Sequence, residues 1–124
     1  MRGMGAPIVR DSDREPFTTR DGSTVRELIR VADGATNQSL AEATVPPGGE
    51  TIEHLHRRSE EIYRFISGRG RIRVAGEERA VGPGDTVLIA PGTPHKLCND
   101  GDGPLVLLCC CAPPYSDEDT ELLE

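Results

Sequence analysis

The chain has 124 residues, which suffices for one domain of ordinary size and excludes large-barrel metallohydrolases and two-domain dehydrogenases. Hydrophobic residues make up 35% and charged residues 28%, so a modest core is expected, and 14 glycines with 10 prolines favour many short strands over a helical bundle. The net charge of −7 argues against a nucleic-acid partner, because such partners are bound mainly through Lys and Arg.

Residues 1–23 are polar and rich in turn formers, and we expect them to form an arm that precedes the main domain. The segment Met1–Pro7 has no apolar core, so no signal peptide is expected. The longest apolar run, Leu105–Ala112, is far shorter than the roughly 20 residues that span a bilayer. The sequence therefore predicts a cytoplasmic protein with no membrane partner.

Alternating apolar residues and closely spaced turns across residues 24–112 predict one all-β domain, a sandwich or barrel. Seven arginines between Arg57 and Arg79 are interleaved with glutamates, which is typical of solvated strand faces. The expected strands cover residues 25–31, 39–45, 51–56, 61–66, 71–75, 78–81, 86–90, 95–99 and 105–112.

Residues 113–124 form an acidic tail after two prolines. Ser116, followed three residues later by Asp119, resembles the start of a helix, because a serine hydroxyl there can accept a backbone hydrogen bond. The pattern predicts a short exposed helical turn, with fraying of the tail as the alternative.

Four cysteines are present: Cys98 and the consecutive Cys109, Cys110 and Cys111. Three in a row on one strand cannot staple a fold, so no disulfide framework is expected. Strand alternation places Cys109 and Cys111 on one face and Cys110 on the other. Our interpretation is small buried side chains kept reduced; the alternative is a thiolate beside an active site.

The chain contains three histidines, and their spacing carries the functional signal. His54 and His56 are two residues apart on an expected strand and so leave the same face. We expect a hairpin turn over residues 57–60 to place Glu61 opposite His56, so these three side chains converge. His95 follows a Gly/Pro-rich turn and joins them if the sheet curls around. Three imidazoles and one carboxylate suit a first-row transition metal.

These histidines have other possible uses. An isolated H-x-H pair is often a surface or core feature, and neither an H-E-x-x-H motif nor a two-pair cysteine zinc motif is present. A Ser-His-acid triad would require a nucleophile on a constrained turn, but Ser59 and Ser67 lack the G-x-S-x-G setting.

The motif pattern resembles that of the cupin family. The first cupin motif consists of Gly, five residues, His, one residue, His, three or four residues, Glu, six residues and Gly. Every fixed position is matched in this sequence, by Gly48, His54, His56, Glu61 and Gly68. The second motif is matched by Gly84, Gly92, His95 and Asn99. It departs at Ala90, where a proline is expected, although Pro91 follows directly.

The resemblance implies a single-domain cupin over residues 24–112, a double-stranded β-helix or jelly-roll barrel. It also implies that His54, His56, Glu61 and His95 bind one divalent transition metal, which is Mn, Fe, Ni, Co, Zn or Cu in similar proteins. Cupins include oxygenases, decarboxylases, isomerases, storage proteins and sensing modules. Two hypotheses therefore stand: a metal-dependent enzyme on a small chelating molecule, or a non-catalytic module in which the metal only organises a binding pocket.

Strand parity predicts the neighbours of the site. If Glu61 faces inward, Tyr63 and Phe65 do so too, whereas Glu60 points outward. Tyr63 is either core packing or a hydroxyl near substrate. On the strand of residues 71–75 the aliphatic side chains should face the barrel and the arginines should lie outside. Asn99 is expected to stabilise its turn.

Two partner expectations follow. Residues 87–90 and 105–108 are apolar on both strand faces, so a second copy of the chain is expected to cover the outer face in a homodimer. A divalent ion with three neutral imidazoles and one carboxylate has a formal charge of +1, which in an aliphatic barrel favours a small anionic oxygen donor as the ligand.

Overall fold

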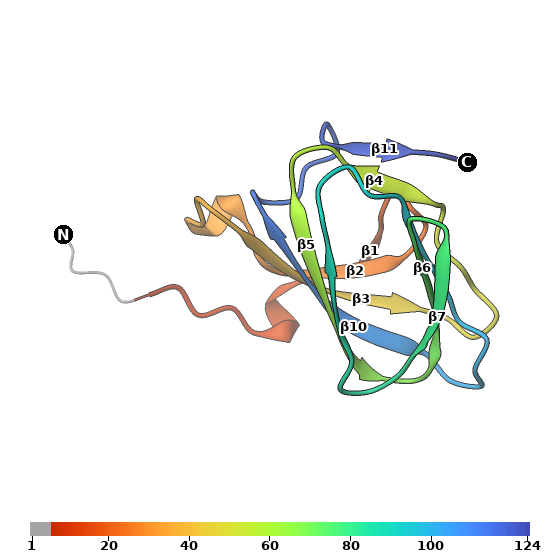
Figure 1. Ribbon diagram of the computed structural model, residues 1–124. Coiled ribbons are helices and arrows are strands. Elements are labelled where there is room, and N and C mark those ends of the chain that lie inside the picture. The colour runs from red at the N-terminus through yellow and green to blue at the C-terminus, as the bar shows by residue number, and fades with distance from the viewer. Residues whose placement is uncertain (1–5) are drawn as a thin grey trace.

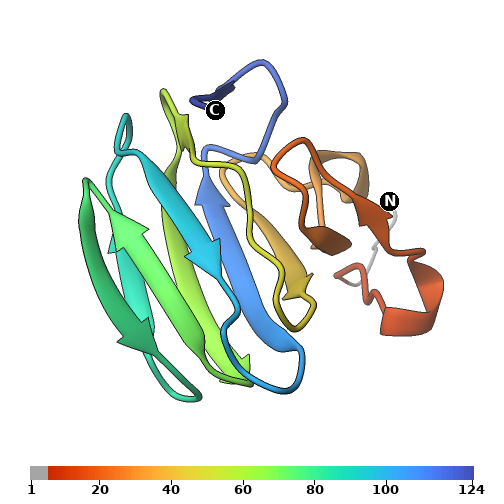
Figure 2. The same cartoon turned by 90° about the vertical axis from the view of Figure 1, so that its right-hand side faces the viewer.

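Two antiparallel sheets pack face to face in the computed structural model, which describes residues 6–124 (Figures 1 and 2). The first sheet has the strand order β1 (Phe17–Thr18), β2 (Thr24–Ile29), β3 (Ser39–Val45), β10 (Leu105–Ala112), β5 (Glu60–Ser67) and β8 (Thr86–Ile89). The second has the order β11 (Thr120–Leu122), β4 (His54–His56), β9 (His95–Cys98), β6 (Gly70–Val74) and β7 (Glu77–Val81). Two short 3₁₀ turns, Asp11–Asp13 and Val31–Asp33, complete the described elements. The expectation of an all-β jelly roll is confirmed.

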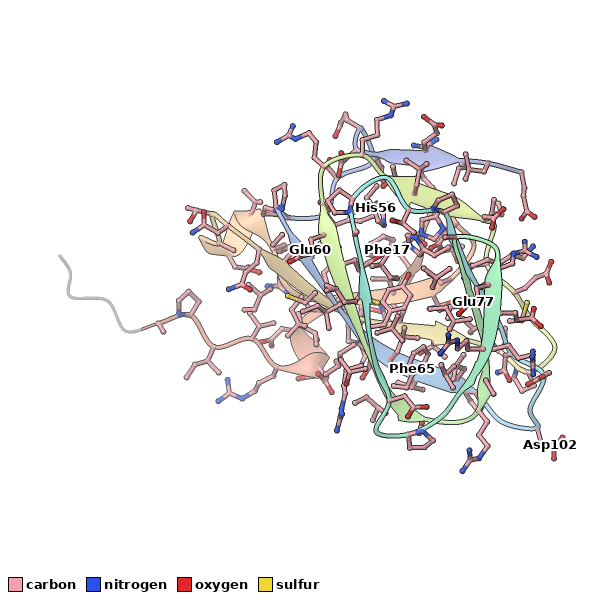
Figure 3. All side chains as sticks on the ribbon, viewed as in Figure 1. Phe17, His56, Glu60, Phe65, Glu77 and Asp102 are labelled. Atoms are coloured by element: carbon pink, nitrogen blue, oxygen red, sulfur yellow. The ribbon has the colours of Figure 1, made fainter. Side chains whose placement is uncertain are left out.

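The core lies between the sheets, and strand alternation builds it. Along β5, Glu61, Tyr63 and Phe65 are buried while the residues between them are exposed, as predicted. Phe65 is completely buried within the hydrophobic cluster, whereas Asp102 extends from an outer loop (Figure 3). Ile72 on β6 also points inward. The buried hydrophobic cluster comprises Ala43, Val45, Tyr63, Phe65, Ile72, Val81, Ile89, Leu97, Leu105 and Leu107.

The connection from β4 to β5 differs from the prediction. We expected a hairpin with Glu61 opposite His56, but β4 pairs with β9 and β11, whereas β5 pairs with β8 and β10 in the other sheet. The turn crosses between the sheets because distant parts of the chain hold it. The backbone N–H groups of Arg58 and Ser59 donate to the Asp119 carboxylate, and the Ser59 hydroxyl donates to the Pro113 carbonyl.

The C-terminal segment also differs from the prediction, which was a helical turn. Ser116 does accept a hydrogen bond from the Asp119 N–H, so the local turn forms, but the chain then extends as β11. Thr120–Leu122 pairs with β4, whose edge would otherwise present unpaired backbone groups. The Leu123 N–H donates to the Glu53 carbonyl and extends this attachment. Tertiary pairing therefore overrides the local helix signal.

Two motif residues have structural roles. Gly68 has a φ of +81°, and a Cβ atom there would lie 2.1 Å from the Pro104 carbonyl oxygen, so no side chain fits. The Asn99 amide donates to the carbonyls of Val45 and Gly103, which confirms that it stabilises its turn. No helix within residues 6–124 has the length and apolar character needed to cross a membrane.

Candidate metal centre

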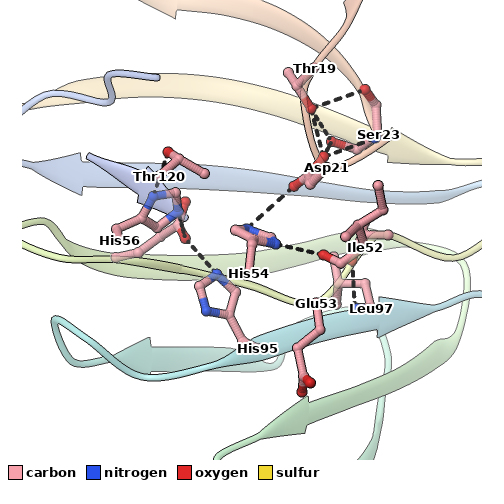
Figure 4. Close-up of polar contacts among 12 residues, drawn as sticks. Thr19, Asp21, Ser23, Ile52, Glu53, His54, His56, His95, Leu97 and Thr120 are labelled. Carbon is pink, nitrogen blue, oxygen red and sulfur yellow. Dashed lines mark hydrogen bonds and ion pairs between the residues drawn. The ribbon is translucent and has the colours of Figure 1, made fainter. Parts of the chain in front are cut away.

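Three imidazole rings come together from strands β4 and β9 (Figure 4). His54 and His56 project from the same face of β4, and His95 opens β9 directly opposite His54. One ring nitrogen from each histidine lies within 4.8 Å of the other two, and all three side chains are buried. The two-residue spacing on β4 and the register with β9 therefore suffice to bring the rings together.

Each ring is oriented by an acceptor on its outer nitrogen. The Nδ1 atoms of His54 and His95 lie 2.8 and 2.9 Å from the carbonyl oxygens of Ile52 and Thr93. A carbonyl can only accept, so these Nδ1 atoms carry the proton. His56 Nδ1 lies 3.0 Å from the Thr120 hydroxyl, whose own proton goes to a backbone carbonyl, so here too Nδ1 donates. In the neutral rings, the Nε2 lone pairs are free to bind a ligand.

Glu61 reaches the cluster from the other sheet. Its Oε1 atom lies 3.2 Å from Nε2 of His56 and 3.2 Å from Nε2 of His95, and its Oε2 atom accepts the thiol of Cys111 at 3.2 Å. Burial acts to raise the pKa of Glu61, but the two histidines outweigh it and hold the pKa well below its usual range. Conversely, Glu61 raises the pKa of His56 against the opposing effect of burial. The side chain is therefore a carboxylate.

The donor set fits a divalent transition metal. Glu61 Oε1 and His95 Nε2 are both fully buried, yet neither has a well-aligned hydrogen-bond partner within the described chain. Two lone-pair atoms 3.2 Å apart repel unless a proton or a metal cation lies between them, and an unsatisfied buried pair is costly. Ligand atoms about 2.1 Å from one ion at a right angle lie about 3 Å apart, close to this spacing. Imidazole and carboxylate are ligands of Mn, Fe, Ni, Co, Zn and Cu.

The four residues singled out in the sequence thus lie together, but by a different route. His95 is the cross-strand neighbour of His54 within one sheet, and Glu61 arrives from the opposite sheet. Sequence reasoning missed two further residues, Asp21 and Thr120. Asp21 Oδ2 lies 3.4 Å from His54 Nε2. The Asp21-Gly22 turn signal was visible, but nothing in the sequence linked it to a histidine more than thirty positions away.

The cysteines next to the site are thiols. Burial, together with the negative charge of Glu61, raises the pKa of Cys111 and of Cys109 well above the usual value. A low-pKa thiolate, the alternative considered from the sequence, is therefore disfavoured. Tyr63 is buried as well, which raises the pKa of its hydroxyl, and its ring packs against His95 with the centroids 5.8 Å apart.

A cavity of about 270 Å³ opens beside the histidines. Most of the exposed cavity surface is apolar, but the lining also includes polar and charged residues such as Asp21, Glu27 and Arg30. Tyr115, half exposed, packs edge-on against His56 with ring centroids 5.7 Å apart. Such a pocket, apolar with a few convergent polar groups, is typical of small-molecule sites. Its lining includes Val25, Ile29, Leu40, Ala43, Tyr63, Cys109 and Tyr115.

Comparisons with known proteins agree with this picture. The chain is 51% identical over 112 residues to the uncharacterized protein MJ1618 of Methanocaldococcus jannaschii, covering 89% of each chain. It is 30% identical over 86 residues to the tetracenomycin polyketide synthase protein TcmJ of Streptomyces glaucescens, covering 68% of this chain and 58% of TcmJ. The structure of the polyketide cyclase RemF from Streptomyces resistomycificus superimposes with a TM-score of 0.76 at 27% identity, covering 91% of this chain and 88% of RemF. The model of the cupin domain matches residues 41–111, and the chain belongs to the cupin family.

Proposed function

We propose that this cupin is a metal-dependent enzyme that acts on a small chelating molecule, with chemistry of the oxygenase, decarboxylase or isomerase type. The observation that carries the proposal is the set of inward-facing Nε2 atoms beside the Glu61 carboxylate, next to a cavity of about 270 Å³. A purely structural cluster would satisfy its own polar atoms, yet Glu61 Oε1 and His95 Nε2 remain without an aligned partner.

His54, His56, Glu61 and His95 are the residues that would hold the metal. A bound divalent ion would supply Lewis-acid polarisation of a substrate oxygen. The protein's contribution is orientation: the carbonyls of Ile52 and Thr93 and the Thr120 hydroxyl keep the three rings turned with Nε2 toward the centre. The candidate ligands are themselves buried, and burial strengthens electrostatic interactions at the site.

The ligand we propose is a small carboxylate, enolate or dihydroxy compound. A divalent ion with three neutral imidazoles and Glu61 has a formal charge of +1, and the apolar wall screens that charge poorly. An anionic oxygen donor therefore gains most from binding there. The relationship to RemF and TcmJ supports enolisable or dihydroxy substrates in particular, since RemF is a polyketide cyclase and TcmJ a polyketide synthase protein.

Neighbouring glutamates on β5 provide a matched test. Glu61→Gln removes the buried carboxylate charge, whereas Glu60→Gln changes an exposed side chain on the opposite face of the same strand. We expect elemental analysis of protein purified without added metal to find one divalent metal per chain in the wild type and in Glu60→Gln, and much less in Glu61→Gln. Equal metal content in both variants would contradict the proposed site.

Catalysis is tested separately from binding. Metal-loaded protein is screened with oxalate, catecholates and 2-oxo acids, following both the spectrum of the Co-substituted protein and turnover with and without O2. Turnover that disappears in Glu61→Gln would support the enzyme. Spectral shifts without turnover on any of these compounds would instead support a non-catalytic binding module.

A further inference from the structure

Asp21 is a second carboxylate at the histidine cluster. It lies on the tight turn between β1 and β2, and its Oδ2 atom is 3.4 Å from Nε2 of His54, the ring that Glu61 does not contact (Figure 4). Its side chain is 16% exposed, so it is largely withdrawn from water. His54 Nε2 is a lone-pair atom in the neutral ring, because Nδ1 carries the proton, so two acceptors face each other here as well.

The two oxygens of Asp21 have different tasks. Oδ1 accepts three hydrogen bonds, from the hydroxyl of Thr19 at 2.6 Å and from the backbone N–H and hydroxyl of Ser23 at 2.9 and 2.7 Å. Oδ2 accepts none of these and is aimed at His54. A carboxylate held through one oxygen, with the other directed at a ring nitrogen, has the arrangement of a supported metal ligand.

The backbone ties this turn to the strand that carries His54. The Ile52 N–H donates to the Asp21 carbonyl at 2.7 Å, and the Ile52 carbonyl in turn accepts His54 Nδ1. Asp21 and the His54 ring are therefore positioned from the same residue. The 3.4 Å spacing between Oδ2 and Nε2 is close to the 3.2 Å that separates Glu61 Oε1 from its two histidines.

We propose that Asp21 is a fifth protein ligand of the metal, so that the centre would have three imidazoles and two carboxylates. This inference rests on the proposed function, since it concerns the same ion. With Asp21 bound, a divalent ion would be formally neutral, which lowers the cost of burying it in the barrel. The formal charge of +1 that favours an anionic ligand would return only when Asp21 leaves the ion.

Two consequences separate this centre from a four-ligand one. Zinc is satisfied by four ligands, whereas manganese favours six and takes carboxylate oxygen readily, so Asp21 should matter more for Mn(II) than for Zn(II). On a six-coordinate ion, five protein ligands leave one open position. A bidentate anion such as oxalate must then displace Asp21 in order to bind.

Asp21→Asn tests the inference, since it removes the charge while keeping the size of the side chain. By competition with a chelator, we expect its Mn(II) affinity to fall at least about 10-fold and its Zn(II) affinity to change less than about 3-fold. The absorption bands of the Co(II)-substituted variant should intensify toward those of a lower coordination number. Oxalate should bind the Co(II)-loaded variant more tightly than the wild type. Glu60→Gln, which removes an exposed carboxylate outside the cavity, serves as the control and should leave all of these values unchanged.

The outcomes are distinct. If Asp21→Asn matches the wild type in Mn(II) affinity and Co(II) spectrum while His54→Ala loses metal, Asp21 is not a ligand and the proposed function stands. If oxalate binds equally well to both proteins, Asp21 does not occupy a position and the inference is wrong. If the wild type itself binds none of these metals, the proposed function and this inference fail together. Thermal unfolding of each variant shows whether it is folded.

Discussion

Replacing Thr120 by valine should weaken metal binding without touching a metal ligand. Thr120 is buried on β11, and its hydroxyl oxygen accepts a hydrogen bond from His56 Nδ1, with 3.0 Å between the two atoms. This bond favours the neutral form of His56 in which Nε2 is bare. Valine keeps the branched shape but offers no acceptor, so the proton moves to Nε2, where it donates to Glu61 Oε1, 3.2 Å away. A metal must then displace that proton.

The size of the effect follows from one hydrogen bond. A hydrogen bond contributes about 1 kcal/mol net, and a buried N–H left without an acceptor costs about 1–3 kcal/mol. In Thr120→Val, the His56 tautomer with an unprotonated Nε2 should therefore become less favourable by about 1–3 kcal/mol relative to the tautomer with the proton on Nε2. Since 1.4 kcal/mol corresponds to about a tenfold change in an equilibrium constant, the metal affinity should fall about 5- to 150-fold.

The assay is competition with a chelator at neutral pH, using Zn(II) or Co(II). Thr120→Ser, which keeps the hydroxyl, is the matched control and should bind within about threefold of the wild type. Urea unfolding of both variants shows whether β11 remains paired with β4. Wild-type affinity in Thr120→Val would refute the reasoning. An equal loss in Thr120→Ser would also refute it, because the methyl group and not the hydroxyl would then be responsible.

Three further predictions concern other parts of the molecule. The double substitution His54→Ala, His95→Ala removes two facing imidazoles and should abolish metal binding by elemental analysis; full occupancy would exclude the site. Ile62 and Leu88 are cross-strand neighbours on the outer sheet face and are 40% and 64% exposed, so we propose that a second copy covers them. Light scattering should give a dimer that Leu88→Glu dissociates, and a monomeric wild type would contradict this. Burial acts to raise the pKa of Asp119, but the hydrogen bonds from the N–H groups of the β4–β5 turn outweigh burial and lower that pKa. Asp119→Asn should therefore be less stable than the wild type at pH 7, and the difference should vanish as the pH falls through that lowered pKa; a difference independent of pH would contradict the assignment.

Strand parity was the most productive signal in the sequence. The alternation along residues 60–67 predicted correctly which side chains of β5 face the core, Glu61 and Phe65 among them. The same two-residue period placed His54 and His56 on one face. The alternation depends only on the local geometry of an extended chain. A prediction of which side chains share a face can therefore be correct even when the predicted strand pairing is wrong.

Strand pairing itself was harder to predict. A four-residue gap between His56 and Glu61 is equally suited to a hairpin and to a corner that joins two sheets. The corner is selected by contacts from the far end of the chain, where Asp119 accepts the N–H groups of the turn. The helix expected after Ser116 failed for a related reason, because β4 has an open edge that the tail can fill. Neither contact leaves a trace in the local sequence.

Two segments outside the central strands, the β1–β2 turn and β11, place side chains next to the histidines. The strands β4, β5 and β9 carry the four candidate ligands, and their inward side chains also belong to the packed interior, so change there costs stability. Asp21 lies on the turn between β1 and β2, and Thr120 lies on the three-residue strand β11. Arg20 joins these segments, since its guanidinium donates to the carbonyls of Asp117 and Thr120. The carboxylate that faces His54 and the hydroxyl that orients His56 are thereby linked through one side chain. Displacing either segment should therefore disturb both rings, and we expect substitutions there to alter metal binding with less effect on the packed interior.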